Sequence, residues 1–205
     1  MSKIRESEFL DLNEFPSGAI TRAALTIVRD GMGAPVQVPI LVAKGSKPGP
    51  VFGLTAALHG NELNGIPVIH RVFERLDPQH IKGTIVAVVV VNVPAYLRHE
   101  REYIDGRDLN RTMPGKADGN VSQVYAHRLL DRVIRHFDFL IDLHTASFGR
   151  VNSLYVRADL GDDRTNRMAR LLRPQILLHN PPNDATLRGA AEDLGIAAVT
   201  LEIGD

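Results

Sequence analysis

Residues 51–93 read VFGLTAALHGNELNGIPVIHRVFERLDPQHIKGTIVAVVVVNV, and this stretch decides the fold. It begins with an apolar run, VFGLTAAL (51–58), which is typical of a buried strand. From Glu62 to Leu76 the apolar residues recur with the spacing of an α-helix. The run GTIVAVVVVNV (83–93) is apolar almost throughout, as expected for a strand covered on both faces. A strand, a helix and a further strand in succession favour an α/β fold.

The same alternation continues on both sides of this stretch. Strands are expected at residues 20–30, 36–43, 137–144, 152–158 and 196–204, and helices at residues 121–134, 164–172 and 184–195. The stretch KGSKPGP (44–50) reads as a Gly/Pro connection, and residues 94–119 form a long polar loop of the kind that is often functional. The alternation predicts a three-layer α/β fold, in which a largely parallel mixed sheet carries helices on both faces.

The composition limits what the protein binds. The chain has 205 residues, enough for one α/β domain, and its formal net charge of zero suggests neither nucleic acid nor an anionic membrane as a partner. No apolar stretch approaches the ~20 residues of a membrane span, and the N-terminal MSKIRESEFLDLNEF has no signal-peptide core. The absence of cysteine excludes disulfides and thiolate metal sites and fits a cytoplasmic location. Any metal ion is therefore held by His, Asp or Glu.

Three side chains capable of chemistry follow strands of the expected sheet. His59 comes directly after one strand, His144 ends a second, and Glu202 lies near the end of a third. Ligands of open α/β sheets bind beyond the carboxyl ends of the strands, so these side chains fall where the fold places its site. The pair His59-x-x-Glu62 offers an imidazole nitrogen and a carboxylate, but taken alone it is explained better by a helix N-terminus whose dipole Glu62 complements. Addition of His144 gives a His₂Glu set, which is one of the known catalytic zinc sets.

Of the other residues near these strand ends, Asp142, Glu202 and Arg188 have two interpretations each. Gly60 allows a backbone conformation closed to other residues, beside the His-Glu pair. Asp142, two residues before His144, either stabilises the strand end or forms a hydrogen bond to a ligand histidine. Glu202 is a carboxylate inside the apolar strand VTLEIG, and it is either a general base or a strand-end residue that points to solvent. Arg188 either reaches the site from a helix start or is a surface charge.

The long loop contains DGRDLNRTMPG (105–115), in which Asn110 and Arg111 are adjacent. An arginine fork and an amide together suit the binding of a carboxylate, whereas a solvated turn accounts for the Asp and Gly residues of the loop. The loop also holds further arginines, one of which is a candidate to polarise a carbonyl, and they are Arg98, Arg101 and Arg107.

Four motifs, HGNELNG, DGRDLNRTMPG, IDLHTAS and VTLEIG, occur in this order. Together they resemble the succinylglutamate desuccinylase/aspartoacylase family, which belongs to the zinc metallocarboxypeptidase-like folds. The resemblance runs from about Gly49 to the last residue. It implies one zinc ion per chain, a general base and a clamp for a substrate carboxylate. The residues implied are His59, Glu62 and His144 for zinc, Glu202 for the base, and Asn110 with Arg111 for the clamp.

The resemblance also implies two further arginines and a division of the chain. The arginine that polarises the scissile carbonyl is expected to be Arg101, with Arg107 as the alternative, and Arg188 resembles an additional substrate-binding arginine. Residues 1–48 are expected to form strands packed on the core, and residues 49–205 the catalytic domain. Because the chain ends three residues after Glu202, we expect that the family's C-terminal β-rich domain is missing.

These observations lead to a first hypothesis, a zinc-dependent hydrolase that cleaves the amide bond of an N-acyl amino acid or similar small carboxylate. The alternative is a zinc metallocarboxypeptidase that acts on a peptide C-terminus. A third hypothesis is a binding protein that kept the fold and lost the catalytic activity. The presence of all four candidate residues argues against it, and they are His59, Glu62, His144 and Glu202. The glycine after His59 resembles the deacylase branch. Association into a homo-oligomer stays open.

Overall fold

The computed structural model describes residues 4–147, 150–182 and 185–204. Its strands are β1 (Arg5–Ser7), β2 (Ala19–Arg29), β3 (Pro35–Lys44), β4 (Lys47–Ala56), β5 (Lys82–Val88), β6 (Phe139–His144), β7 (Leu154–Ala158), β8 (Ile176–His179) and β9 (Ala197–Ile203). Its α-helices are α1 (Gly65–Arg75), α2 (Val93–Tyr96), α3 (Val121–Arg132), α4 (Asp163–Leu171) and α5 (Leu187–Asp193). Short 3₁₀ turns lie between them, among them η3 (Leu109–Arg111). None of the helices in the described ranges is long and apolar enough to cross a membrane.

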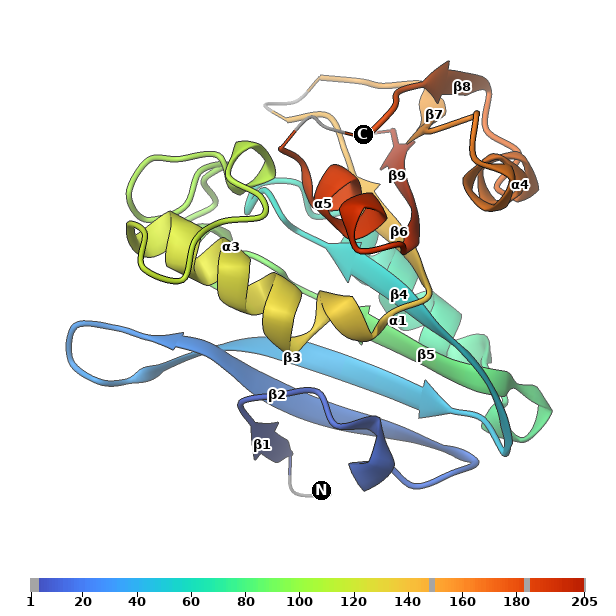
Figure 1. Cartoon of the computed structure of the whole chain (residues 1–205), viewed down its shortest axis with the longest axis horizontal. Helices are drawn as coiled ribbons and strands as arrows, with labels where there is room; N and C mark the ends of the chain where they lie inside the picture. Colours follow the sequence, from blue (N-terminus) through green and yellow to red (C-terminus); the bar gives the residue numbers. More distant parts are fainter. Residues whose placement is uncertain (1–3, 148–149, 183–184, 205) are drawn as a thin grey trace.

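The described strands form one nine-stranded sheet in the order β1-β2-β3-β5-β4-β6-β9-β7-β8 (Figure 1). The central strands β5, β4, β6 and β9 are parallel to one another. Antiparallel pairs flank them, β2 with β3 and β3 with β5 on one side, and β7 with β9 on the other. The prediction of a largely parallel mixed sheet is therefore confirmed, and β1 to β3 belong to the same sheet as the rest.

Helices cover both faces of this sheet, as predicted. The helices α3 and α5 lie on one face, where Leu129 and Leu187 belong to one buried apolar cluster. The helices α1 and α4 lie on the other face, where Ile69 and Ala169 belong to a second buried cluster. Figure 1 shows α3 and α5 in front of the sheet and α1 behind it. Burial of apolar side chains in two separate layers holds the helices against the sheet.

Several boundaries differ from the expected ones, each for a local reason. The sheet includes part of the expected connection 44–50, because Lys47 already pairs with Lys82. The strand expected to reach residue 93 ends at Val88, because the Asn92 side chain accepts a hydrogen bond from the Ala95 backbone and begins α2 there. The strands β1 and β8 were not expected, since they are short and lie at the two ends of the sheet order, where alternation is weak.

Candidate metal centre and active site

The three side chains of the predicted His₂Glu set meet at the carboxyl edge of the sheet. His59 and Glu62 lie in the turn that joins β4 to α1, and His144 is the last residue of β6. Because β4 and β6 are adjacent parallel strands, the turn after β4 lies beside the end of β6. All three side chains are buried, with 3–4% of their surfaces exposed.

Gly60 is required in this turn, but not for the special backbone conformation that the sequence suggested. Gly60 does not adopt a left-handed backbone conformation, which is found instead at Ala57 with φ 51°. A Cβ atom on Gly60 would lie 2.2 Å from the carbonyl carbon of Ala95 in α2. Glycine is therefore required at this position because a neighbouring backbone packs directly against the turn.

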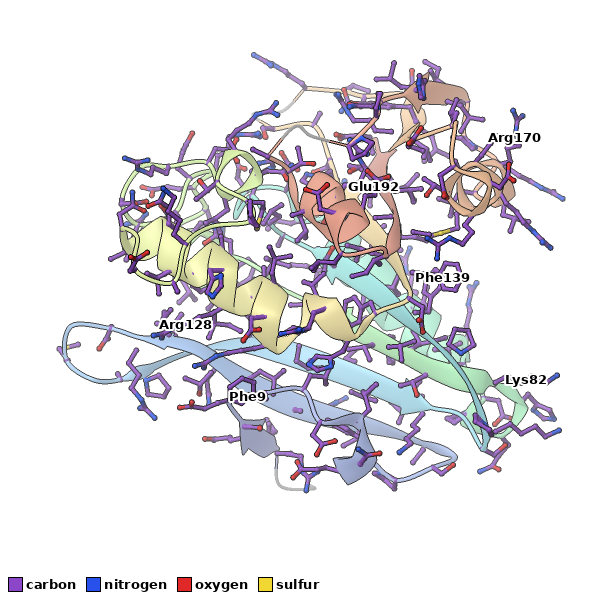
Figure 2. All side chains as sticks on the ribbon, viewed as in Figure 1. Phe9, Lys82, Arg128, Phe139, Arg170 and Glu192 are labelled. Carbon is purple, nitrogen blue, oxygen red and sulfur yellow. The ribbon has the colours of Figure 1, made fainter. Side chains whose placement is uncertain are left out.

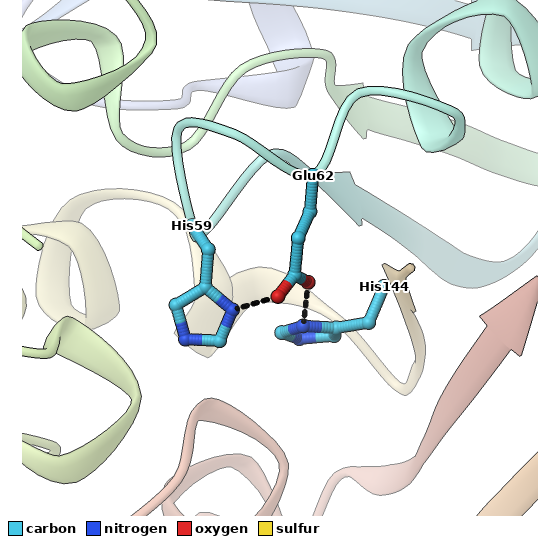
Figure 3. A group of neighbouring side chains, drawn as sticks. All are labelled: His59, Glu62 and His144. Atoms are coloured by element: carbon cyan, nitrogen blue, oxygen red, sulfur yellow. Dashed lines mark hydrogen bonds and ion pairs between the residues drawn. The ribbon is translucent and has the colours of Figure 1, made fainter. Parts of the chain in front are cut away.

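Glu62 lies between the two imidazole rings (Figure 3). The Nδ1 atom of His59 is 2.8 Å from Glu62 Oε1, and the Nδ1 atom of His144 is 2.9 Å from Glu62 Oε2. One candidate ligand atom from each residue lies within 4.8 Å of the other two. Within the described ranges, no other group of three or more His, Asp or Glu residues is arranged in this way. This cluster could hold a metal ion.

Each histidine is also held by an aspartate through its other ring nitrogen. The Nε2 atom of His59 is 3.0 Å from Asp108 Oδ1, and the Nε2 atom of His144 is 2.7 Å from Asp142 Oδ2. Asp142 is fully buried and also accepts a hydrogen bond of 2.6 Å from Thr55. Carboxylates in these positions fix the ring orientation and leave both Nδ1 atoms facing the same point, as metal-binding histidines require.

Burial and neighbouring charges set the protonation of the cluster. Burial raises the pKa of Glu62, but hydrogen bonds with His144 and His59 outweigh it and hold that pKa well below its ordinary value. Burial lowers the pKa of His144, whereas the charge of Asp142 and hydrogen bonds with Asp142 and Glu62 raise it well above its ordinary value. Burial raises the pKa of Asp108 too, and the hydrogen bond with His59 lowers it overall. Glu62 and Asp108 are thus ionised and place negative charge beside the two rings.

Asp108 is a site residue that the sequence did not reveal. It precedes Asn110 in the loop motif, and its Oδ1 atom accepts a hydrogen bond of 2.8 Å from the Asn110 backbone, which caps η3. From the sequence, the aspartates of this loop are explained by turn geometry alone. In fact Asp108 serves the turn and His59 together, and its position two residues before Asn110 was the available signal.

Replacement of Asp108 by asparagine is expected to weaken the binding of a metal ion at this cluster about 10- to 100-fold, because His59 loses the carboxylate that orients its ring and raises its basicity. Competition with a chromophoric chelator measures this affinity. Asp77→Asn is the matched control, since Asp77 contacts His80 at 2.8 Å in the same way on the surface. Equal metal affinity in the two variants would show that Asp108 does not support a metal ligand.

The two candidate arginines for the carbonyl occupy different environments. Arg101 donates from Nη1 to Glu62 Oε1 at 2.9 Å and from Nη2 to Asp108 Oδ2 at 2.9 Å, and it lines the cavity above the cluster. Arg107 is more than half exposed, and its side chain approaches Asp105 at 3.9 Å. Ser147, which the sequence did not reveal, donates to Glu62 at 2.6 Å and accepts from Arg101 at 2.8 Å. The structure thus brings Arg101, and not Arg107, to the cluster.

The cavity above the cluster has a volume of about 510 Å³ and reaches the predicted clamp. Asn110 and Arg111 lie in η3 and line the cavity. The Asn110 side-chain oxygen accepts a hydrogen bond of 2.9 Å from the Leu187 backbone, so the loop is tied to the start of α5. Arg188 also lines the cavity, but it is 1% exposed and donates to Glu192 at 2.6 Å. Glu192 extends from α5 (Figure 2) and balances the charge of Arg188.

Glu202 faces the same cavity from β9. It pairs in register with His144, lines the cavity and is half-buried, so it does not point to open solvent. Its carboxylate accepts a hydrogen bond of 3.2 Å from Asn152, which the sequence did not reveal. Burial raises the pKa of Glu202, and the charge of His144 only partly offsets this effect. A carboxylate with a raised pKa beside the cluster is suited to accept and return a proton.

Comparison with known proteins finds similarity to a deacetylase and to a desuccinylase. The catalytic-domain model of the succinylglutamate desuccinylase/aspartoacylase family matches residues 48–205. An N-alpha-acetyl-L-2,4-diaminobutyric acid deacetylase of Halomonas elongata is 32% identical over 111 residues, which cover 54% of this chain and 32% of that protein. A succinylglutamate desuccinylase of Pseudomonas paraeruginosa is 26% identical over 165 residues, which cover 74% of this chain and 49% of that protein.

Among solved structures, a succinylglutamate desuccinylase/aspartoacylase of Rhodobacter sphaeroides superposes with a TM-score of 0.82 at 26% identity, over 96% of this chain and 62% of that one. The chain spans half or less of the length of the two curated relatives. The family match covers most of the chain, including all four motifs and the cluster at the sheet edge. The chain therefore belongs to the succinylglutamate desuccinylase/aspartoacylase family.

Proposed function

We propose that this protein is a zinc-dependent hydrolase that cleaves the amide bond of an N-acyl amino acid or a similar small carboxylate. The observation that carries the proposal is the buried cluster of His59, Glu62 and His144, in which an aspartate holds the outer nitrogen of each ring. Family membership and the deacetylase and desuccinylase relatives support the amide bond as the target. The cavity above the cluster is large enough for a small substrate.

The donor set fits zinc. Two imidazole nitrogens and one carboxylate form a known catalytic zinc set, in which a further position is left for water or substrate. His59, Glu62 and His144 would hold the ion, and their supporting aspartates are in place. Zinc, when bound in such a set, supplies a Lewis acid and lowers the pKa of a bound water toward ~7.

The residues around the cluster have complementary roles in the proposed reaction. Glu202 accepts a proton from the attacking water and returns it to the leaving amine, for which its raised pKa is an advantage. Arg101 stabilises the negative charge that develops on the carbonyl oxygen, since it already lies beside Glu62. Glu202 approaches from β9 and Arg101 from the long loop, so the two groups act from different walls of the cavity.

The substrate carboxylate is held by the clamp. The guanidinium of Arg111 and the amide of Asn110 provide directed donors on a turn that α5 and Asp108 fix in place. Such fixed donors orient the scissile bond toward the cluster. Arg188 contributes further donors to the cavity wall, while Glu192 already balances its charge.

The zinc-loaded protein is expected to release amine from N-acetyl and N-succinyl amino acids, and to leave short peptides with free C-termini intact. A fluorogenic amine assay measures this release, and protein stripped of metal by a chelator is the control. Cleavage of the peptides in preference to the N-acyl amino acids would support the alternative, a carboxypeptidase. Lack of turnover with both substrate classes would contradict the proposed function.

A further inference from the structure

Three side chains stand in one row across the end of the sheet, on β6, β9 and β7. The strand β7 lies beside β9 (Figure 1) and runs antiparallel to it, with Tyr155 paired with Glu202. Glu202 is paired in turn with His144 on β6. Paired residues of neighbouring strands point to the same face, and on an antiparallel pair their Cβ atoms lie about 4.5–5.5 Å apart. Tyr155 is therefore the cross-strand neighbour of the proposed general base, on the side away from the metal cluster.

The contact with Arg157 sets the direction in which the Tyr155 hydroxyl acts. The Nη2 atom of Arg157 donates to the Tyr155 hydroxyl at 2.9 Å, and the guanidinium carbon lies 5.3 Å from the centre of the ring. A guanidinium has N–H donors and no acceptor, so the hydroxyl oxygen accepts this bond and its own proton is left for another acceptor. The neighbouring positive charge polarises the hydroxyl and makes it a stronger donor.

Glu202 is the acceptor that this hydroxyl meets. Burial has the largest effect on the pKa of Glu202 and raises it, while the charge of Arg157 and a hydrogen bond with Tyr155 lower it. Burial also raises the pKa of Tyr155, and the charge of Glu202 raises it further. A tyrosine whose pKa lies above its ordinary value of about 10 keeps its proton at neutral pH and donates it to an ionised carboxylate. Arg157 and Tyr155 thus act on Glu202 together, one through its charge and one through its hydroxyl.

A second donor reaches the same carboxylate from the chain just before β7. The Nδ2 atom of Asn152 donates to Glu202 Oε2 at 3.2 Å. Residues 152–157 therefore supply two donors and a positive charge to one carboxylate. A glutamate side chain has three rotatable bonds, and donors from a strand remove much of that freedom before any ligand arrives. A general base needs such a fixed position, because it works only within hydrogen-bond reach of the proton it accepts.

We propose that Tyr155 is a positioning residue, whose hydroxyl is directed by Arg157 and holds the Glu202 carboxylate in the orientation for proton transfer. The inference rests on the proposed function, because that function makes Glu202 the general base. Glu202 and Arg157 line the cavity and Tyr155 does not, so Tyr155 acts through Glu202 and not on the substrate. Loss of its hydroxyl therefore affects kcat and leaves KM nearly unchanged.

The kinetic test removes the hydroxyl and keeps the ring. In the zinc-loaded protein, Tyr155→Phe is expected to lower kcat for an N-acyl amino acid about 10- to 100-fold, the range for a hydrogen bond to a charged group. When Glu202→Gln is already present, Tyr155→Phe is expected to cause no further loss, because the hydroxyl has no other route to the reaction. Tyr96→Phe is the matched control with full activity, since Tyr96 is a half-buried tyrosine of α2 outside the cavity lining.

A second measurement uses metal-free protein and does not depend on turnover. Urea unfolding gives the stability of the unchanged protein, of Tyr155→Phe, of Glu202→Ala and of the double variant. Both single changes break the same contact, so the double variant is expected to unfold less readily than the two single effects predict, by about 3- to 30-fold in the unfolding equilibrium constant. Tyr96→Phe combined with Glu202→Ala is expected to show no such coupling.

Three results would overturn the inference. They are an unchanged kcat in Tyr155→Phe, an equal loss of kcat whether or not Glu202→Gln is present, and independent effects of the two changes on unfolding. The second result would mean that Tyr155 supports the fold of the site without acting through Glu202. Failure of the proposed function is a different result, because it is seen as absent hydrolysis by the unchanged zinc-loaded protein, while the unfolding measurements still decide whether Tyr155 holds Glu202.

Discussion

Glu202→Gln is expected to lower kcat by about 10²- to 10⁴-fold, the range for loss of a general acid–base group. Glutamine has nearly the same shape and can still contact Asn152, but it cannot accept and return a proton at neutral pH. Zinc content and the KM for an N-acyl amino acid are expected to change little, because Glu202 is not part of the His59–Glu62–His144 cluster or the clamp. Steady-state kinetics and metal analysis on the same preparation measure both quantities.

The matched control for this variant is Glu74→Gln, an exposed glutamate on α1, which is expected to retain full activity. A kcat within a few-fold of the unchanged protein in Glu202→Gln would remove Glu202 from the proton transfer. A large loss of zinc from the same variant would mean that Glu202 supports the metal site instead.

His144→Ala is expected to lower zinc affinity about 10³-fold and to remove measurable turnover. Zinc bound by a protein site contributes about 10–16 kcal/mol, so loss of one of three protein ligands removes a few kcal/mol of this energy. The change also leaves Asp142 buried without its partner at 2.7 Å, so some loss of thermal stability is expected as well. Chelator competition gives the affinity, and thermal unfolding of the metal-free protein gives the stability.

His70→Ala is the control, because His70 is exposed on α1. His59→Ala serves as a second test of the cluster, since it removes a ligand without leaving Asp142 unpaired. If both cluster variants bind zinc as tightly as His70→Ala does, the metal site lies elsewhere.

The sequence predicts the fold and the cluster because both depend on strand ends that can be read from apolar runs. His59 follows the run 51–58, and His144 ends the run 137–144, so their placement at one edge follows from a parallel sheet. The contact between Asp108 and His59 could not be read, because 49 residues separate them and a loop without periodicity brings them together. Arg157, which also lines the cavity, was missed for another reason. A tyrosine and an arginine alternating on a short strand look like a solvated face, and only the pairing of β7 with β9 turns that face toward the cavity.

Asp108 also has a consequence for how the site responds to its ligands. The same carboxylate contacts His59 and Arg101 and caps the turn that carries Asn110. A carboxylate that enters the clamp therefore acts on a turn whose cap orients a ring of the metal site. Coupling of this kind is reciprocal. If a bound metal ion raises the affinity of the clamp for a carboxylate by some factor, an occupied clamp raises the affinity of the site for the metal ion by the same factor. The protein would then bind its metal ion most tightly while a substrate occupies the clamp.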